Sequence, residues 1–297
     1  MGSGRWASSD YESYAKTTNY VSASREEVFA SRNMPPSLDP RRIVMREAFD
    51  SVDNPNSTPI ILALDVTGSM GEYAELIAKE SLPQLMGAIL EQLPVSDPHM
   101  MFMAVDDIHT YNAPNALQVS QFEADIRIIE ELRKIWLVGG GGGNNSESYD
   151  LPWYFAAKKT ALDSVEKRGK KGYLFSFGDE EAPYESLTEA KLKQLFDGEV
   201  EPMTPEQALE LAKKKFNVFH IVIEQGSYCR SRGQRVRETW TKMMGSNVLF
   251  LEDFKNLTAL VIATMQVAEG ADLEQTISES NCPAALRHAF ANALSQD

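Results

Sequence analysis

Cysteine is scarce in this chain of 297 residues, which has only Cys229 and Cys282. Two cysteines can form one bridge, but they exclude a disulfide framework and a cysteine-rich zinc site. Apolar runs of the length that spans a membrane, about 18 residues or more, are absent as well. Residues 1–20 are polar and lack the apolar core of a secretory signal. We therefore expect a soluble, cytoplasmic protein.

Basic residues are also few in comparison with acidic residues. The chain has 29 Lys and Arg residues against 43 Asp and Glu residues, which gives a formal net charge of −14. Phosphate backbones and anionic lipid surfaces repel such a protein, so nucleic acid and membranes are disfavoured as partners. Cations and basic protein surfaces are the favoured partners.

Catalytic motifs are missing too. The chain has four histidines: His99, His109, His220 and His288. None shows the spacing of paired metal ligands, and no serine or cysteine nucleophile motif accompanies them. We therefore expect no enzymatic activity.

The sequence does contain a regular alternation of apolar strands and amphipathic helices. Strands are predicted at 60–64, 100–105, 117–122, 172–177, 217–223 and 248–251. Helices are predicted at 72–93, 123–134, 149–166, 187–196, 205–216, 234–244, 257–267 and 283–294. Pro83 predicts a kink or break of the first helix near Glu80. The alternation is typical of an α/β fold with a doubly wound, mostly parallel six-stranded sheet and helices on both faces.

The ends of the chain do not continue this pattern. Residues 1–57 are interpreted as an N-terminal arm and lead-in. Residues 1–40 are predicted to be extended and to order only against another surface, or to be a disordered tail. Residues 40–49 are compatible with one helical turn or an edge strand. We expect a single domain over 58–269 and a C-terminal helical tail over 270–297.

A short stretch directly after the first predicted strand carries side-chain oxygens. Asp65, Thr67 and Ser69 follow the apolar run 60–64 at alternate positions. In a nearly extended loop this spacing directs all three side chains to the same side, toward one point. Hard divalent cations such as Mg²⁺ prefer oxygen ligands, and a set with few carboxylates leaves the ion part of its charge. The alternative is that Asp65 and Thr67 only cap the next helix.

The stretch Asp65-Val66-Thr67-Gly68-Ser69 resembles the first motif of the von Willebrand factor A domain family. In that family a metal-ion-dependent adhesion site follows an Asp-x-Ser/Thr-x-Ser pattern after the first core strand. The resemblance covers about residues 58–269, and it implies a Rossmann-like sheet whose third strand is short and antiparallel at one edge. It also implies a bound Mg²⁺, with Mn²⁺ or Ca²⁺ as alternatives.

Two further loops are similar to the metal-binding loops of this family. Asp179 follows the fourth predicted strand, where the family places an aspartate. The glycine-rich loop that contains Gly141–Gly143 aligns with a Gly-Gly-Gly-Asp-x-Pro-Glu pattern. These three glycines and Glu147 match the pattern. Asn144 stands in place of the Asp and Ser146 in place of the Pro, and both still offer an oxygen. The alternative is a flexible loop without a ligand; a phosphate-binding loop is disfavoured because no Gly-Lys-Ser/Thr follows.

In an open doubly wound sheet, ligands bind beyond the carboxyl ends of the strands, where the strand order reverses. For the expected order this point lies between the strand that ends at Asp65 and the strand that ends at Asp179. The predicted metal site consists of Asp65, Thr67, Ser69, Asp179 and Asn144, with Ser146 and Glu147 as weaker candidates.

Further charged residues fall in loops near the predicted site. The acidic ones are Asp106, Asp107, Glu147, Asp150, Glu180 and Glu181. If they form a rim around the metal, a partner is expected to frame its acidic residue with Lys or Arg; the alternative is solvated loop charges. A basic cluster consists of Arg230, Arg232, Arg235 and Arg237. It is predicted to be a solvated helix start or to contact the acidic arm.

Together these features predict a metal-ion-dependent protein–protein interaction module whose metal captures an acidic residue of a partner. The resemblance implies work in a multi-protein assembly or with an AAA+ ATPase. The alternative is a structural or assembly subunit in which the metal only stabilises the fold. A metal-dependent hydrolase is less favoured, because hydrolases with an aspartyl nucleophile carry a second acid two positions later, where this chain has Thr67.

Overall fold

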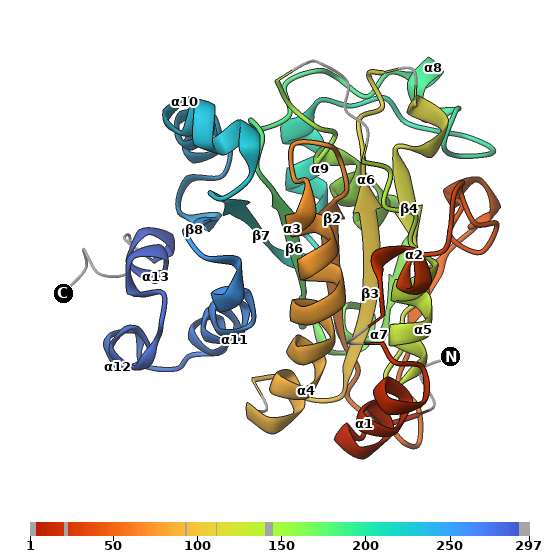
Figure 1. Ribbon diagram of the computed structural model, residues 1–297. Coiled ribbons are helices and arrows are strands. Elements are labelled where there is room, and N and C mark those ends of the chain that lie inside the picture. Colours follow the sequence, from red (N-terminus) through yellow and green to blue (C-terminus); the bar gives the residue numbers. More distant parts are fainter. Residues whose placement is uncertain (1–3, 21–22, 93, 111, 140–144, 291–297) are drawn as a thin grey trace.

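A six-stranded sheet in the order β4-β3-β2-β6-β7-β8 forms the centre of the protein (Figure 1). The computed structural model describes residues 4–20, 23–92, 94–110, 112–139 and 145–290. The strands of this sheet are β2 Thr58–Asp65, β3 Pro98–Val105, β4 Leu117–Val119, β6 Gly172–Gly178, β7 Phe216–Ile223 and β8 Val248–Leu251. All neighbours pair in parallel except β4, which runs antiparallel to β3 at one edge. The predicted doubly wound sheet with a short antiparallel edge strand is therefore confirmed.

The apolar run of β2 separates two helical layers. Successive strand side chains point to opposite faces, and every residue of β2 is buried. Ile60, Leu62 and Leu64 pack in a core with helices from one face, whereas Ile61 and Ala63 pack in the core of the other face. This double burial explains why the run is continuously apolar instead of alternating.

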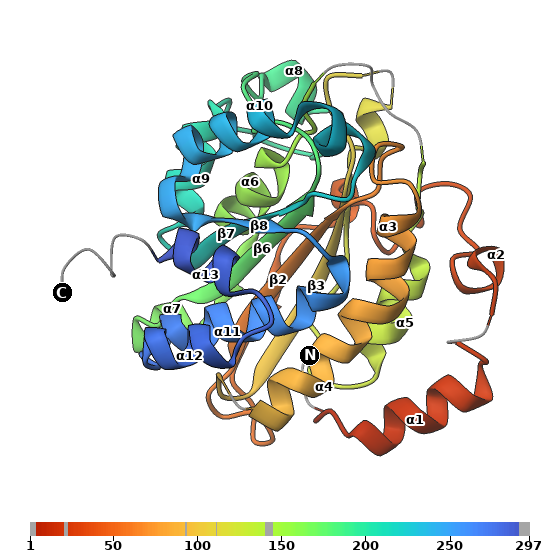
Figure 2. The same cartoon turned by 60° about the vertical axis from the view of Figure 1, so that its left-hand side comes forward.

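The helices divide between the two faces, as Figures 1 and 2 show from two sides. One face is covered by α3 Glu72–Leu76, α4 Leu82–Gln92, α5 Arg127–Lys134 and α11 Leu257–Ala268. The other face is covered by α6 Asp150–Lys158, α9 Pro205–Ala212 and α10 Ser227–Met244. The short helix α8 Glu189–Leu192 lies in the long connection between β6 and α9. None of the helices in the described part of the chain is long and apolar enough to cross a membrane.

The break predicted from Pro83 is present. A π-helical turn, Ile77–Ser81, separates α3 from α4. Proline has no backbone N–H and its ring crowds the preceding turn, so the regular hydrogen-bond ladder cannot continue through it. The wider turn therefore falls directly before the residue pair that starts α4.

The single helix predicted at 149–166 is wrong. The chain instead forms α6 Asp150–Lys158, the strand β5 Thr160–Leu162 and the helix α7 Asp163–Arg168. β5 pairs in parallel with β1 Arg46–Ala48 in a separate two-stranded sheet. Local periodicity did not reveal this strand because its partner lies more than a hundred residues earlier in the chain. The 40–49 segment contains both expected alternatives, a 3-10 turn at Pro40–Arg42 and the strand β1.

The N-terminal segment is folded onto the domain, so the prediction of an extended or disordered arm is wrong for its described part. It contains α1 Ser8–Thr17 and α2 Arg25–Val28. Tyr20, Phe29 and Leu38 are at most 2% exposed and belong to the core that includes β2 and α4. Sparse aromatic residues in a polar segment have no helical period, but they pack in pairs, Trp6 on Tyr11 and Tyr14 beside Tyr20, against the domain.

The C-terminal tail also packs on the domain. It forms α12 Leu273–Glu279 and α13 Pro283–Ala289, and α13 contacts β8. Leu286 of α13 is fully buried. The helix predicted from 283 is present as α13, and its predicted end at 294 lies outside the described residues.

The packing of the N-terminal segment predicts a stability effect. Phe29 is 2% exposed and Val52 is 99% exposed. Phe29→Ala is expected to lower the free energy of unfolding by about 3 to 5 kcal/mol, because a buried aromatic ring leaves a cavity. Val52→Ala, a matched control on the surface, should change it by less than about 0.5 kcal/mol. Urea denaturation followed by circular dichroism measures both, and equal midpoints would show that the segment is not part of the core.

Candidate functional site

Asp65 ends β2 and is fully buried. Its Oδ1 accepts hydrogen bonds from the backbone N–H of Thr67 at 2.9 Å and from the Thr67 hydroxyl at 2.6 Å. An aspartate that bonds the backbone two residues later forms a local turn. The turn bends the chain away from the sheet and starts the loop that leads to α3. The helix α3 begins at Glu72 without a side-chain cap, so Asp65 does not have the helix-capping role considered as its alternative.

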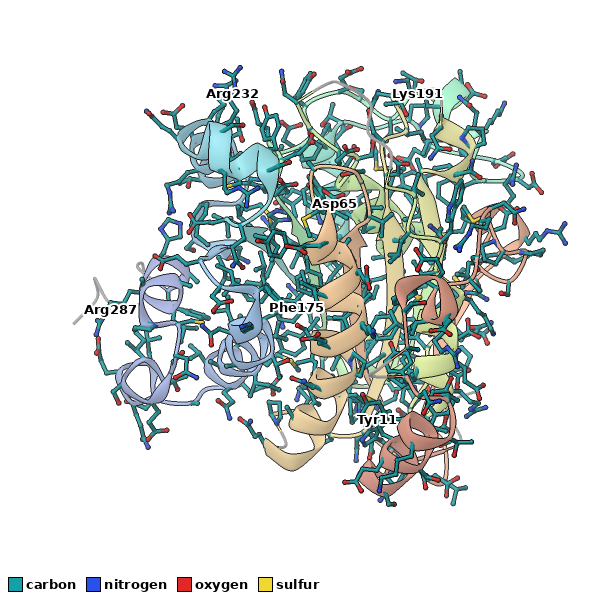
Figure 3. All side chains as sticks on the ribbon, viewed as in Figure 1. Tyr11, Asp65, Phe175, Lys191, Arg232 and Arg287 are labelled. Atoms are coloured by element: carbon teal, nitrogen blue, oxygen red, sulfur yellow. The ribbon has the colours of Figure 1, made fainter. Side chains whose placement is uncertain are left out.

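The structure brings Asp179, Ser69 and Thr67 together, although Asp179 lies far away in the sequence. β2 and β6 are neighbours, and Asp179 follows the last residue of β6. The Ser69 hydroxyl donates to Asp179 Oδ1 at 2.7 Å, and it lies 3.2 Å from the Thr67 hydroxyl. The four side chains therefore form one cluster: the hydroxyl hydrogens are directed to Asp65 and Asp179, and the two hydroxyl oxygens face each other with no hydrogen left to join them. In Figure 3, Asp65 lies toward the same end of the molecule as Arg232 and away from Tyr11.

Tyr149 is a site residue that the sequence did not reveal. Its hydroxyl donates to Asp65 Oδ2 at 2.6 Å, and its ring is fully buried. Gly178 makes room for it, because a Cβ at that position would lie 2.1 Å from the tyrosine oxygen. A buried tyrosine before a helix looks like an ordinary core aromatic, so its sequence context carries no sign of this contact.

The start of α10 holds the two loops in place. The backbone N–H of Tyr228 donates to Asp179 Oδ2 at 2.9 Å. The backbone N–H and the hydroxyl of Ser227 both donate to the carbonyl oxygen of Ser69 at 3.0 Å. A Cβ at Gly226 would lie 2.2 Å from the Asp179 Cβ, so glycine permits this close approach. The helix was predicted to start at 234; non-helical backbone at Arg232 divides α10 into a first turn from Ser227, which contacts Asp179, and a longer part that begins close to the predicted start.

The glycine loop can be described only from Asn145 onward. Asn144 and the matching glycines lie outside the described residues. The Ser146 hydroxyl donates to the carbonyl oxygen of Glu181 at 3.0 Å, and the Asn145 carbonyl accepts from the Glu181 N–H at 3.1 Å. Ser146 thus ties this loop to the segment after β6. Glu147 is 2% exposed, and its Oε2 has no hydrogen-bond partner among the described residues.

The acidic residues around the site are buried instead of solvated. Each of the six is at most 7% exposed: Asp106, Asp107, Glu147, Asp150, Glu180 and Glu181. A partner would not meet them at the surface, so the reason for expecting Lys or Arg around its acidic residue is removed. Glu181 is neutralised locally, since it accepts hydrogen bonds from the Tyr228 hydroxyl at 2.9 Å and from Arg235 Nε at 3.0 Å.

Burial and mutual repulsion raise the pKa values of three carboxyl groups at the site, those of Asp65, Glu147 and Glu180. Burial, followed by the charge of Asp179, raises the pKa of Asp65 to about 7. Burial and the charge of Asp65 raise the pKa of Glu147 to about 11 and that of Glu180 to about 8. Like Glu147, Glu180 has one carboxylate oxygen without a hydrogen-bond partner among the described residues. Such shifts mean that the site lacks positive charge, which a bound cation would supply.

A metal site here would depend on hydroxyl oxygens. Within the described residues no three Asp, Glu, His or Cys side chains are grouped as metal ligands. Asp65 and Asp179 supply carboxylates, and Thr67 and Ser69 supply the hydroxyls between them. An all-oxygen set of this kind suits a hard divalent cation.

Two of the four arginines in the basic cluster on α10 form ion pairs, and the other two are exposed. Arg235 pairs with Glu181, and Arg237 pairs with Glu224 at 2.6 Å while its guanidinium lies 3.7 Å from the centre of the Phe250 ring. The described contacts are therefore with the domain itself and not with the N-terminal arm. Arg230 and Arg232 are exposed.

No protein-family model and no curated protein matches the chain. A von Willebrand factor type A protein from Catenulispora acidiphila has 13% identity and a TM-score of 0.37, covering 73% of this chain and 44% of its own. The pilus adhesin SpaC from Lactobacillus rhamnosus GG, in an open conformation, has 9% identity and a TM-score of 0.44, covering 75% and 30%. Proximal thread matrix protein 1 from the mussel byssus has 13% identity and a TM-score of 0.43, covering 71% and 48%. The chain spans less than half of each of these proteins, and similarity this low carries no information about function.

Asp150 provides a test of the charge imbalance. It is fully buried, neither carboxylate oxygen has a hydrogen-bond partner among the described residues, and burial raises its pKa to about 8. Between pH of about 4 and about 8 the folded state keeps this proton while the unfolded chain, with a pKa of about 3.9, releases it. Stability is therefore lost as the pH rises through this window.

Asp150→Asn removes the titration, so the variant should exceed the wild type in free energy of unfolding by on the order of 5 kcal/mol at the upper end of the window. The difference should vanish at the lower end, where the wild-type carboxyl is neutral in both states. Denaturation across the pH range measures it, with Asp197→Asn on the surface as the control. Parallel pH profiles for the wild type and Asp150→Asn would refute the assignment.

Proposed function

We propose that this protein is a metal-ion-dependent protein–protein interaction module. Asp65, Thr67, Ser69 and Asp179 would hold a Mg²⁺ ion, or alternatively Mn²⁺ or Ca²⁺, some of them through water. The observation that carries the proposal is the cluster of side-chain oxygens in which these four residues meet across β2 and β6. Buried carboxylates with raised pKa values surround it, and a cation would offset their repulsion.

The same ligand set favours capture of an acidic group. Two carboxylates balance the formal charge of a divalent ion, and four protein ligands leave coordination positions open for a further oxygen ligand. A carboxylate from a partner protein would complete the coordination and would be held as a charge-assisted contact. Glu147, in the glycine-rich loop, is a further ligand candidate. One of its buried carboxylate oxygens has no hydrogen-bond partner among the described residues, and burial and the negative charge of Asp65 raise the pKa of its carboxyl group. Asn144, outside the described residues, keeps its place in the proposal from the sequence pattern alone.

A structural or assembly subunit is the second candidate. The observation in its favour is a group of exposed apolar side chains in the lead-in before β2: Val44, Met45, Phe49 and Val52. Such side chains could contact a neighbour without any metal. In this case the ion would only stabilise the fold. The resemblance to the von Willebrand factor A family supports either an assembly role or work with an AAA+ ATPase, and a metal-dependent hydrolase has the least support.

Metal binding is tested by thermal unfolding with added Mg²⁺ and then with EDTA. At a free Mg²⁺ concentration about 100 times the dissociation constant, the wild type should gain about 2.7 kcal/mol of stability, and EDTA should reverse the gain. Asp65→Ala should show no gain, because it removes a proposed ligand. Asp197→Ala, which removes an exposed carboxylate elsewhere, should respond like the wild type. No Mg²⁺ response in the wild type would rule out the proposed site.

The capture of a partner is tested by a pull-down from the native source with the full chain as bait. Proteins bound through the metal should be retained in Mg²⁺, should be released by EDTA and should be missing from an Asp65→Ala bait. Asp197→Ala serves again as the control. Partners that remain bound in EDTA and on the Asp65→Ala bait would instead identify a structural subunit.

A further inference from the structure

Each aspartate of the proposed metal site has one carboxylate oxygen inside the cluster and one outside it. Asp65 Oδ1 accepts from a hydroxyl of the cluster, whereas its Oδ2 accepts from the Tyr149 hydroxyl at 2.6 Å. Asp179 Oδ1 also accepts from a hydroxyl of the cluster, whereas its Oδ2 accepts from the backbone N–H of Tyr228 at 2.9 Å. Donors that are not ligand candidates therefore occupy both outer oxygens, and the two inner oxygens remain for a metal ion.

The Tyr149 hydroxyl has a single hydrogen, and its surroundings direct that hydrogen to Asp65. The tyrosine oxygen accepts from the backbone N–H of Glu180 at 3.4 Å, so its own hydrogen is left for Asp65 Oδ2. Asp65 and Tyr149 are both fully buried. A hydroxyl that donates to an ionised carboxylate over such a short distance forms a bond roughly twice as strong as one between neutral groups.

The ring of Tyr149 is held in place from several sides. The His220 ring packs edge-on against it, with 4.9 Å between the ring centroids, and the Trp240 ring packs at 5.4 Å. These two rings are fully buried and stack on each other at 3.5 Å. A Cβ at Gly178 would lie 2.1 Å from the Tyr149 oxygen, so the backbone of β6 closes a further side. The hydroxyl therefore cannot leave Asp65 without displacing closely packed groups.

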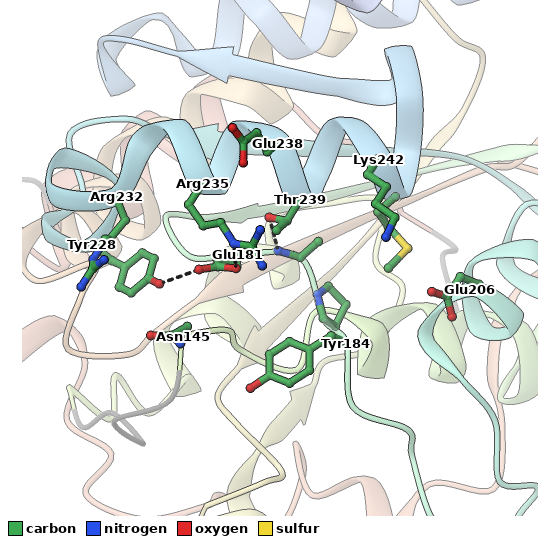
Figure 4. A pocket seen from close by; sticks show the side chains of 13 residues that line it. Asn145, Glu181, Tyr184, Glu206, Tyr228, Arg232, Arg235, Glu238, Thr239 and Lys242 are labelled. Carbon is green, nitrogen blue, oxygen red and sulfur yellow. Dashed lines mark hydrogen bonds and ion pairs between the residues drawn. The ribbon is translucent and has the colours of Figure 1, made fainter.

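The first turn of α10 holds the outer oxygen of Asp179 in a similar way. The Tyr228 hydroxyl donates to Glu181 at 2.9 Å, which anchors the residue whose N–H reaches Asp179 (Figure 4). The N–H and the hydroxyl of Ser227 donate to the carbonyl oxygen of Ser69 at 3.0 Å. Because the turn is tied to both loops of the site, the Asp179 carboxylate keeps Oδ1 toward the cluster.

The number of oxygens that an aspartate offers discriminates between divalent ions. Ca²⁺ takes about six to eight oxygen ligands and accepts a carboxylate through one or both oxygens, whereas Mg²⁺ demands a nearly ideal octahedron. One oxygen each from Asp65, Asp179 and the two hydroxyls forms a small ligand set. This set leaves open positions in an octahedron, but it leaves Ca²⁺ short of ligands.

We propose that Tyr149 determines which metal ion the site binds. Its hydroxyl keeps Asp65 Oδ2 away from the ion, so that Asp65 binds through Oδ1 alone and the site selects Mg²⁺ over Ca²⁺. Tyr149 does not contact the ion and is a positioning residue that acts through Asp65. The same restriction preserves the open position that a partner carboxylate needs. This inference rests on the proposed function and adds the ion selectivity of the same site.

The test compares the affinities of the full chain for Mg²⁺ and for Ca²⁺, each obtained from the rise of the unfolding temperature with ion concentration. The wild type should bind Mg²⁺ at least about ten-fold more tightly than Ca²⁺. Tyr149→Phe removes only the hydroxyl and frees Asp65 Oδ2, so the ratio of the two affinities should fall at least about ten-fold. A general weakening of the site would lower both affinities equally and would leave this ratio unchanged.

Tyr154→Phe is the matched control. Tyr154 lies in α6, which follows Tyr149 directly, and it is 2% exposed. Its hydroxyl accepts from the backbone N–H of Glu201 at 3.3 Å and not from a residue of the site. The control variant should therefore keep the wild-type ratio of affinities.

A second measurement uses the wild type alone and does not depend on the folding of a variant. Infrared difference spectra with and without Mg²⁺ report how carboxylates bind an ion. A carboxylate that binds through one oxygen has more widely separated stretching bands than one that binds through both. The wild type should show the one-oxygen pattern.

The outcomes separate the selectivity from the metal site itself. Equal affinities of the wild type for Mg²⁺ and Ca²⁺, or a two-oxygen infrared pattern, would overturn the role of Tyr149 and leave the proposed function in place. An unchanged ratio in Tyr149→Phe would show that the residue only supports the fold, which also overturns its role. Binding of neither ion by the wild type would refute the proposed metal site, and the selectivity with it.

Discussion

The burial of like charges at the carboxyl ends of two adjacent parallel strands is the constraint on which the site depends. Asp65 is the last residue of β2, and Asp179 directly follows β6. Both are fully buried. Two carboxylates removed from water destabilise each other unless donors or a cation compensate them. The surrounding groups are donors: the Thr67 and Ser69 hydroxyls, the Tyr149 hydroxyl and the first N–H groups of α10. Neutral donors offset part of the free-energy cost of burying the two charges. The pKa of Asp65 is still raised, so the donors do not offset the whole cost.

The fold produces this arrangement through close contacts that only small residues permit. Parallel pairing of β2 with β6 sets the distance between the two strand ends. Gly178 lets the ring of Tyr149 approach β6, and Gly226 lets α10 begin against Asp179. A side chain at either glycine would displace a group that holds a carboxylate. The site is thus assembled by backbone geometry first and by side-chain chemistry second.

The sequence predicted the features that have a local signal. The continuous apolar run of β2, the break caused by Pro83 and the meeting of Asp65 with Asp179 all follow from local pattern combined with the rule for parallel sheets. The strand β5 and the folding of the N-terminal segment depend on partners far away in the chain. Tyr149 was missed for a related reason, since burial and a polar contact of its hydroxyl are invisible in a single sequence.

The difference between buried and exposed charge decides what kind of partner suits the site. In the sequence the loop acids and the arginines of α10 look like one mixed surface, which suggested a partner with basic residues beside its acid. The structure places the loop acids in the interior, whereas the exposed part of α10 carries both signs, with Arg232 and Lys242 beside Glu238. Buried charges act strongly on each other over short distances, whereas exposed charges are screened by water and salt. The buried acids therefore determine the electrostatics at the strand ends, and the exposed charges of both signs do not single out a partner with basic residues.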